Sequence, residues 1–157
     1  LPEQTVRDSP RFERIMLFLA AALMESFDIH VQVTTDTAYG CVEGFVLTPA
    51  RRAIIANWIG GEQMWHVDTT ARASIVGELT EVAGEVAAHS MVEADTPAGR
   101  LQALAHYLDL DWGWLTSRCA QLAAHGVAGL IQPRSRLLSL AGLDRACAFV
   151  GTLKAGG

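Results

Sequence analysis

The sequence contains little cysteine, and its three cysteines are far apart. Cys41, Cys119 and Cys147 form no C-x-x-C pair, and their number is odd. This spacing argues against a structural zinc site and against a disulfide framework. The reducing cytoplasm is therefore the expected compartment.

Catalytic motifs are also missing. The chain has no G-x-S-x-G, no phosphate-binding glycine loop and no G-x-G-x-x-G after a predicted strand. Its five histidines form no H-x-H or H-E-x-x-H arrangement, so no metal ligands are predicted. Asp109 and Asp111 are better explained as helix caps than as a carboxylate pair. We expect no catalytic residue and no cofactor, and a small enzyme with an unfamiliar site is the least favoured class.

Long apolar runs are absent as well. The longest, residues 15–24, is ten residues long, whereas a membrane-spanning helix needs about 20. It has neither the flanks nor the cleavage site of a signal peptide, so no membrane partner is expected. The sequence begins with Leu1 and not Met, so a longer chain with a further part before Leu1 stays open.

The composition is that of an ordered globular protein. With 157 residues, 50% of them hydrophobic and 18% charged, one domain over 1–157 is expected. The net charge is −5, but residues 1–111 carry seven Arg against 16 acids, and residues 112–157 five basic residues against one acid. This basic end could contact an anion. The alternative is charge complementarity within the fold or across a homodimer.

The centre of the chain predicts an antiparallel sheet. Residues 29–34 alternate apolar and polar side chains, and residues 53–59 are rich in β-branched and aromatic types. Pro49 suits a turn, and Gly60-Gly61 a hairpin. We predict a four-stranded meander with strands at 28–35, 41–48, 53–59 and 63–68.

Helices are predicted before and after this sheet in the sequence. The first, over 9–27, begins with Ser9 as N-cap and Pro10 at the first helical position, and should cover one face of the sheet. Asp68-Thr69-Thr70 would cap a second helix, in which Gly77 and Gly84 would allow close approach of another element. The predicted later helices cover about 71–90, 97–109, 112–125 and 141–154. The expected class is α+β, with the sheet within 28–69 and a helical part over 70–157.

Aromatic side chains provide the first candidate site. Small-molecule pockets are apolar and aromatic with a few polar groups, and two tryptophans lie on neighbouring predicted strands. Packing of the same rings in the core is the alternative. The candidate ligand-binding residues are Trp58, Trp65, His66, Asn57, Tyr107 and Trp112.

Residues 104–122 provide the second candidate site, since their spacing resembles a helix-turn-helix. Asp109 stands where the turn often has Gly, and the second helix would present Arg118 and Gln121 to base edges. Arg134 and Arg136, after Pro133, could add phosphate contacts. An ordinary helical hairpin and a solvated turn are the alternative interpretations.

Most of the chain, from Asp8-Ser9-Pro10 through FVLTPARRAIIANW and MWHVDT to RLQALAHYLDLDWGWL, resembles the region C-terminal to the DNA-binding domain in actinobacterial Xre-type regulators. The resemblance lies in the general character of these segments and in their order along the chain, and it includes no functional motif. It implies an effector-binding or dimerising module of a transcription regulator. The partners would be a small-molecule effector, a second copy of the chain, and DNA through a region outside it.

Overall fold

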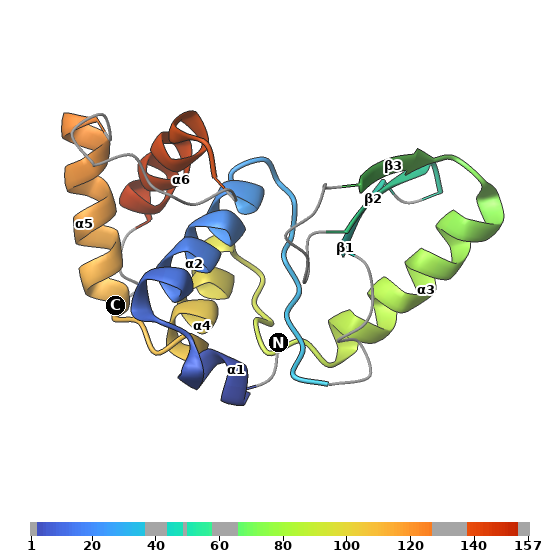
Figure 1. The fold of residues 1–157 in the computed structure, drawn as a ribbon, viewed down its shortest axis with the longest axis horizontal. Helices are drawn as coiled ribbons and strands as arrows, with labels where there is room; N and C mark the ends of the chain where they lie inside the picture. Colours follow the sequence, from blue (N-terminus) through green and yellow to red (C-terminus); the bar gives the residue numbers. More distant parts are fainter. Residues whose placement is uncertain (1–2, 37–43, 49, 58–65, 127–137, 154–157) are drawn as a thin grey trace. The chain divides into compact units, whose positions relative to one another are not determined.

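Residues 3–36, 44–48, 50–57, 66–126 and 138–153 are described by a computed structural model (Figure 1). Contacts divide the chain into two compact units. Unit 1 is Val33–Ser90, and unit 2 combines Pro2–Gln32 with Met91–Gly157. The two segments of unit 2 therefore flank unit 1 in the sequence.

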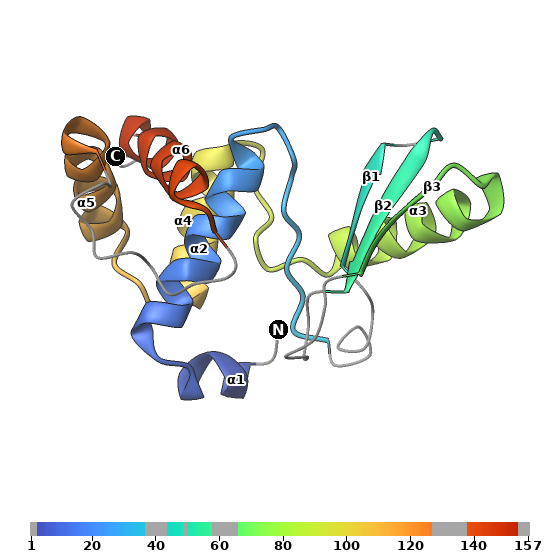
Figure 2. The same ribbon diagram turned by 45° about the horizontal axis from the view of Figure 1, so that its top comes forward.

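Unit 1 contains an antiparallel sheet and one helix. The strands β1 (Gly44–Thr48), β2 (Arg52–Asn57) and β3 (His66–Thr70) pair in the order β1-β2-β3. Helix α3 (Ala73–Ala88) contacts β1 and β2 and runs along the sheet in Figure 2. The predicted α+β class and antiparallel meander are confirmed.

The predicted turn between the first two of these strands is present. The Arg51 N–H donates to the Thr48 carbonyl at 3.0 Å, as a β-turn requires. Ala50 has φ of 55°, a left-handed conformation that costs a residue with a Cβ about 1–2 kcal/mol. The predicted Pro49 and the Gly60-Gly61 hairpin lie outside the described residues.

The fourth predicted strand, at 28–35, is wrong. Residues 29–36 have no regular secondary structure. Side chains, and not a neighbouring strand, accept from this backbone: the Val31 N–H donates to the Glu25 carboxylate at 3.1 Å, and the Val33 N–H to Ser90 Oγ at 3.3 Å. Because side chains accept from these N–H groups, the backbone of the predicted strand needs no neighbouring strand as a partner.

Unit 1 buries few apolar side chains. Among its described residues only Ala53 and Val76 are buried hydrophobics, whereas Ile54 and Val67 are 43% and 58% exposed. The prediction that Gly77 and Gly84 allow close approach is wrong for the part of the chain that the structure describes, because a Cβ at either glycine would meet none of its atoms within 4 Å. Only a narrow face of helix α3 is therefore packed against the rest of unit 1.

The predicted cap of this helix is also wrong. Residues 68–70 belong to β3, and the N-cap of α3 is Arg72, without a side-chain cap bond. Thr70 Oγ1 instead accepts from the Arg72 N–H at 3.2 Å. Pairing with β2 takes these residues into the sheet before the helix begins.

Unit 2 is helical. Its elements are α1 (Glu3–Asp8), α2 (Arg11–Glu25), α4 (Pro97–Tyr107), α5 (Trp112–His125) and α6 (Leu140–Thr152). The last three agree closely with the predicted ranges, whereas α1 was not predicted. Within unit 2, α2 packs against α4 and α6, and within unit 1 the helix that contacts β1 and β2 is α3. The packing of the first helix on the sheet stays a prediction.

The helix caps decide most of these boundaries. Asp111 Oδ1 accepts from the Trp114 N–H, as predicted, and Thr96 Oγ1 accepts from the Gly99 N–H. Ser9 is not the N-cap of α2, since Pro10 holds that position and Ser9 Oγ donates to the Thr5 carbonyl.

The core of unit 2 lies between α2 and the C-terminal helices. Phe18 on α2 is fully buried and meets Trp112 edge-on, with ring centroids 6.3 Å apart. Leu101, Leu108 and Leu115 are also buried. Burial of each such side chain contributes about 1.5–3 kcal/mol, so this cluster dominates the stability of the unit.

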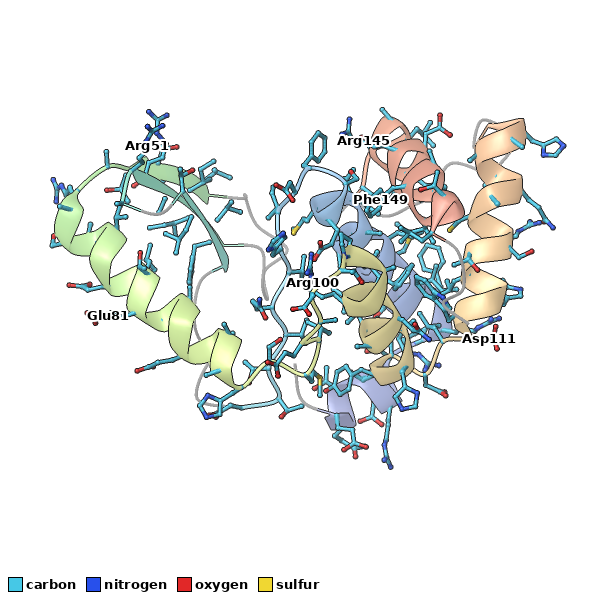
Figure 3. All side chains as sticks on the ribbon, turned by 180° about the vertical axis from the view of Figure 1, so that it is seen from behind. Arg51, Glu81, Arg100, Asp111, Arg145 and Phe149 are labelled. Atoms are coloured by element: carbon cyan, nitrogen blue, oxygen red, sulfur yellow. The ribbon has the colours of Figure 1, made fainter. Side chains whose placement is uncertain are left out.

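A buried ion pair ties the N-terminal segment of unit 2 to its C-terminal one. Arg100 donates to both carboxylate oxygens of Glu25, at 2.9 and 2.7 Å, and their side chains are 8% and 1% exposed. The pair also holds the chain on either side of unit 1: Glu25 accepts from Val31, and Arg100 Nη1 donates to the Ala94 carbonyl at 2.8 Å. Figure 3 shows Arg100 on α4. Hydrogen bonding to Glu25 raises the pKa of Arg100, so its charge is permanent.

Candidate functional site

The described part of unit 2 contains an apolar pocket between α2, α5 and α6, which we call the helical pocket. Each helix contributes side chains spaced three or four residues apart, so one face of each is presented. Its volume is about 230 Å³. The lining residues are Phe12, Ile15, Met16 and Leu19 of α2, Trp114, Leu115, Arg118, Cys119 and Leu122 of α5, and Leu143 and Cys147 of α6.

Tight packing on α6 fixes the helices around this pocket. A Cβ at Gly151 would lie 2.8 Å from Ala120 Cα, so α5 and α6 approach closely there. A Cβ at Gly142 would lie 3.1 Å from Leu23 Cδ2, so α6 also lies close to α2. Ser139 starts α6 with its Oγ accepting from the Gly142 N–H at 3.0 Å. The contacts between α5 and α6 and between α6 and α2 therefore hold the walls of the pocket in place.

The described residues that line the pocket include one arginine and no acid, although Asp144 lies close enough to act on Cys147. Arg118 is the one charged residue among those that line it, and it is exposed and donates to Gln121 Oε1 at 3.1 Å. The Arg11 guanidinium lies 4.5 Å from the ring centroid of Trp114, another lining residue. Such a cation–π contact holds an arginine over an indole face. Two arginines therefore lie at or beside a small apolar pocket.

Two thiols belong to the pocket lining. Cys119 and Cys147 are both free and buried. Hydrogen bonding between them and burial raise the pKa of Cys119, whereas the same hydrogen bond lowers the pKa of Cys147, against opposing effects of burial and Asp144. Of the two sulfurs, Cys147 is therefore the one whose pKa is lowered by its neighbour, so it more readily becomes a thiolate.

The structure describes only part of the predicted aromatic site. Trp58 and Trp65 lie outside the described residues, and Asn57 and His66 are a register pair of β2 and β3 whose side chains are not described. The predicted aromatic ligand-binding site on the sheet therefore stays a prediction.

The two predicted site residues of unit 2 have structural surroundings. Trp112 is half-buried against Phe18, and its buried Nε1 has no hydrogen-bond partner among the described residues. Tyr107 ends α4, and burial, followed by the charge of Glu3, raises its pKa. Neither ring is in the lining of the helical pocket.

Residues 104–122, the predicted helix-turn-helix, span the end of α4, a turn and most of α5. Helix α4 ends in a turn at Asp109, whose φ of 52° is the left-handed conformation that favours Gly. Arg14 of α2 fixes this turn by donating to the Leu108 carbonyl at 2.8 Å. Arg118 and Gln121 are exposed on α5. The other predicted nucleic-acid residues, Arg134 and Arg136, are outside the described ranges.

Sequence reasoning missed the helical pocket. The prediction for the helix over 9–27 concerns only the sheet, and Cys119 and Cys147 are considered only for zinc and disulfides. The available signal was an apolar stripe on each of three helices. Nothing in their spacing shows that the stripes meet at one cavity.

Comparisons with known proteins add no relative. No family model matches the chain, and no curated protein or solved structure matches it. Function is therefore inferred from the residues of this chain alone.

In the described ranges no helix is both long and apolar enough to span a bilayer. Nor do three or more His, Cys, Asp and Glu side chains gather there as metal ligands would.

Proposed function

We propose that this chain is a regulatory, effector-binding domain of a bacterial transcription regulator, and that its effector occupies the helical pocket. The observation that carries the proposal is an apolar pocket with two arginines at or beside it and no lining acid. The resemblance to Xre-type regulators supplies the regulatory context.

The size and charge of the pocket define the class of ligand. At about 230 Å³ it is smaller than the roughly 300–1,000 Å³ of pockets for drug-sized molecules. The lining favours an aliphatic or aromatic tail, and Arg118 favours a carboxylate. Short acyl or aryl carboxylates are therefore the proposed effectors.

Thermal unfolding with matched ligands tests this proposal. Octanoate and phenylacetate should stabilise the protein, by about 2.7 kcal/mol at 100 times Kd, and octan-1-ol and 2-phenylethanol should do so less. Arg118→Gln should remove the preference for the carboxylate. Leu122→Trp should fill the pocket and abolish binding, whereas Leu17→Trp, at a 40% exposed position outside the lining, should leave it intact. Equal behaviour of the two Trp variants would contradict the proposal.

DNA binding by the α4–α5 pair is the second candidate function. It is favoured by the left-handed turn at Asp109 and by Arg118 and Gln121 exposed on the second helix. Fluorescence anisotropy with labelled duplex at low salt is the test. Gln121→Ala should weaken the preference for one sequence, and Arg118→Ala should reduce the salt slope by about 0.9. Absence of any salt-sensitive binding would exclude this function.

The expected homodimer is the remaining part of the proposal. Ile54 on β2 and Val67 on β3 lie on one face of the sheet, since the strand register pairs Ile54 with Thr69 and Ala56 with Val67. Both side chains are exposed, and a second copy would cover them. Sedimentation should show a dimer that Ile54→Thr with Val67→Thr converts to monomer. A monomeric unmodified chain at high concentration would rule the dimer out.

A further inference from the structure

Two cysteines from different helices share the helical pocket. Cys119 of α5 and Cys147 of α6 both line it and are only 4% and 0% exposed. Because both residues belong to the lining, the pocket is the route by which a small reagent would approach the pair. A buried thiol that does not open on a cavity is inert by comparison.

The helix packing brings these two sulfurs together. Gly151 lies four residues after Cys147, on the same face of α6, and Ala120 follows Cys119 directly on α5. A Cβ at Gly151 would lie 2.8 Å from Ala120 Cα and 2.9 Å from Ala120 N. Backbones this close suit the short Cα separation that a disulfide needs. The pKa of each thiol is shifted by the other, as expected of neighbouring sulfurs.

We propose that Cys119 and Cys147 are a reactive dithiol, which a small hydroperoxide oxidises to an intramolecular disulfide through the helical pocket. The proposal is independent of the effector, because an oxidant needs only access and a nucleophilic sulfur.

The reaction proceeds in two balanced steps. The Cys147 thiolate attacks the terminal oxygen of the hydroperoxide, so that an S–O bond forms, the O–O bond breaks, and the alcohol or water leaves with a proton. Cys119 then attacks the sulfenic sulfur of Cys147. The S–S bond forms, the S–O bond breaks, and the second oxygen leaves as water with the Cys119 proton.

The electrostatics assign the roles within the pair. The interaction between the two thiols lowers the pKa of Cys147 and raises the pKa of Cys119. The other charged groups involved are Asp144, which opposes ionisation of Cys147, and Arg118, which lines the same pocket. Cys147 is therefore the attacking sulfur and Cys119 the resolving one.

Mass spectrometry of the folded chain tests the pair. All tested variants also carry Cys41→Ser, so that Cys119 and Cys147 are the only cysteines whose oxidation is detected. Hydrogen peroxide should remove two hydrogens and give one linked peptide containing both cysteines. With Cys119→Ser, the product should be a Cys147 sulfenic acid that dimedone traps. With Cys147→Ser, oxidation should be at least tenfold slower.

Access through the pocket is tested separately, on a protein that keeps both thiols. Leu122→Trp should slow oxidation by cumene hydroperoxide several-fold, whereas Leu17→Trp should not. Circular dichroism before oxidation shows that each variant is folded. Two thiols that survive peroxide in the folded protein, or linkage only between molecules, would overturn the proposal. Equal rates for the two Ser variants would overturn the assignment of the attacking sulfur.

Discussion

The two units differ in how much of their own surface they bury. All but two of the buried hydrophobic side chains in the described residues belong to unit 2. Unit 1 has complete strand pairing between β1, β2 and β3, yet it leaves Ile54 and Val67 exposed. Hydrogen-bonded secondary structure is therefore formed in both units, but a closed core is formed in one. Substitutions in the core of unit 2 should therefore lower the free energy of unfolding more than substitutions in unit 1.

The largest effect is expected at the centre of unit 2. Phe18→Ala removes a fully buried ring and its edge-on contact with Trp112, so the free energy of unfolding should fall by about 3–5 kcal/mol. Urea denaturation measures this loss. Phe27→Ala is the matched control, because that ring is 55% exposed. Equal losses would remove the distinction between core and surface in this unit.

Breaking the buried ion pair should cost nearly as much. Arg100→Met leaves the Glu25 carboxylate buried without its partner, which lowers stability by about 3 kcal/mol. Hydrogen exchange should become faster at Val31, whose N–H depends on Glu25. Arg7→Met provides the control, since the Arg7–Glu3 pair is 71% and 63% exposed and contributes at most about 1 kcal/mol. A loss no larger than that of the control would contradict a stabilising role for the pair.

A smaller effect is expected in unit 1. Val76→Ala removes two methyl groups from one of its two buried hydrophobic side chains, a loss of about 1.5 kcal/mol. Hydrogen exchange should accelerate in β1, β2 and α3 and not in α5 or α6. Acceleration spread over both units would mean that they unfold together.

Relief of backbone strain should stabilise unit 1 slightly. Ala50 has φ of 55°, so Ala50→Gly removes a steric penalty but adds freedom to the unfolded chain. The net gain should be about 0.5–1 kcal/mol, measured as an increase in Tm. Ala53→Gly, at a buried strand position, should destabilise instead.

The alkaline pH dependence should carry a contribution specific to unit 2. Burial and Glu3 raise the pKa of Tyr107 above its ordinary value of 10.0. Above that pH the unfolded chain loses the phenol proton while the folded chain keeps it, so the stabilisation present below pH 10 is lost as pH rises. Tyr107→Phe should reduce this loss in a pH series of thermal unfolding. Tyr39→Phe is the comparison, and an identical pH series for the two variants would contradict the assignment.

The helices could be predicted from the sequence wherever the start was marked locally. Thr96-Pro97 and Asp111 give α4 and α5 their observed first residues. Three of the four predicted strands are present, since their turns and β-branched runs are also local. Residues 28–35 were misassigned because Glu25 and Ser90, outside the run, satisfy its backbone.

The pocket depends on tertiary contacts and could not be read from spacing. Phe12, Cys119 and Cys147 meet only after α2, α5 and α6 have packed. Close approach at Gly151 is likewise a property of two helices together. An apolar stripe predicts that a face is buried, but it does not identify the partner face.

The interrupted sequence of unit 2 also affects how the chain folds as it is synthesised. Helix α2 leaves the ribosome with its apolar stripe before any of α4, α5 or α6 has been made. Glu25 must wait for Arg100, 75 residues later, and during that interval the stripe is a target for chaperones. Unit 1 has all of its own residues before the second segment of unit 2 emerges, so the weaker core is the first that can form.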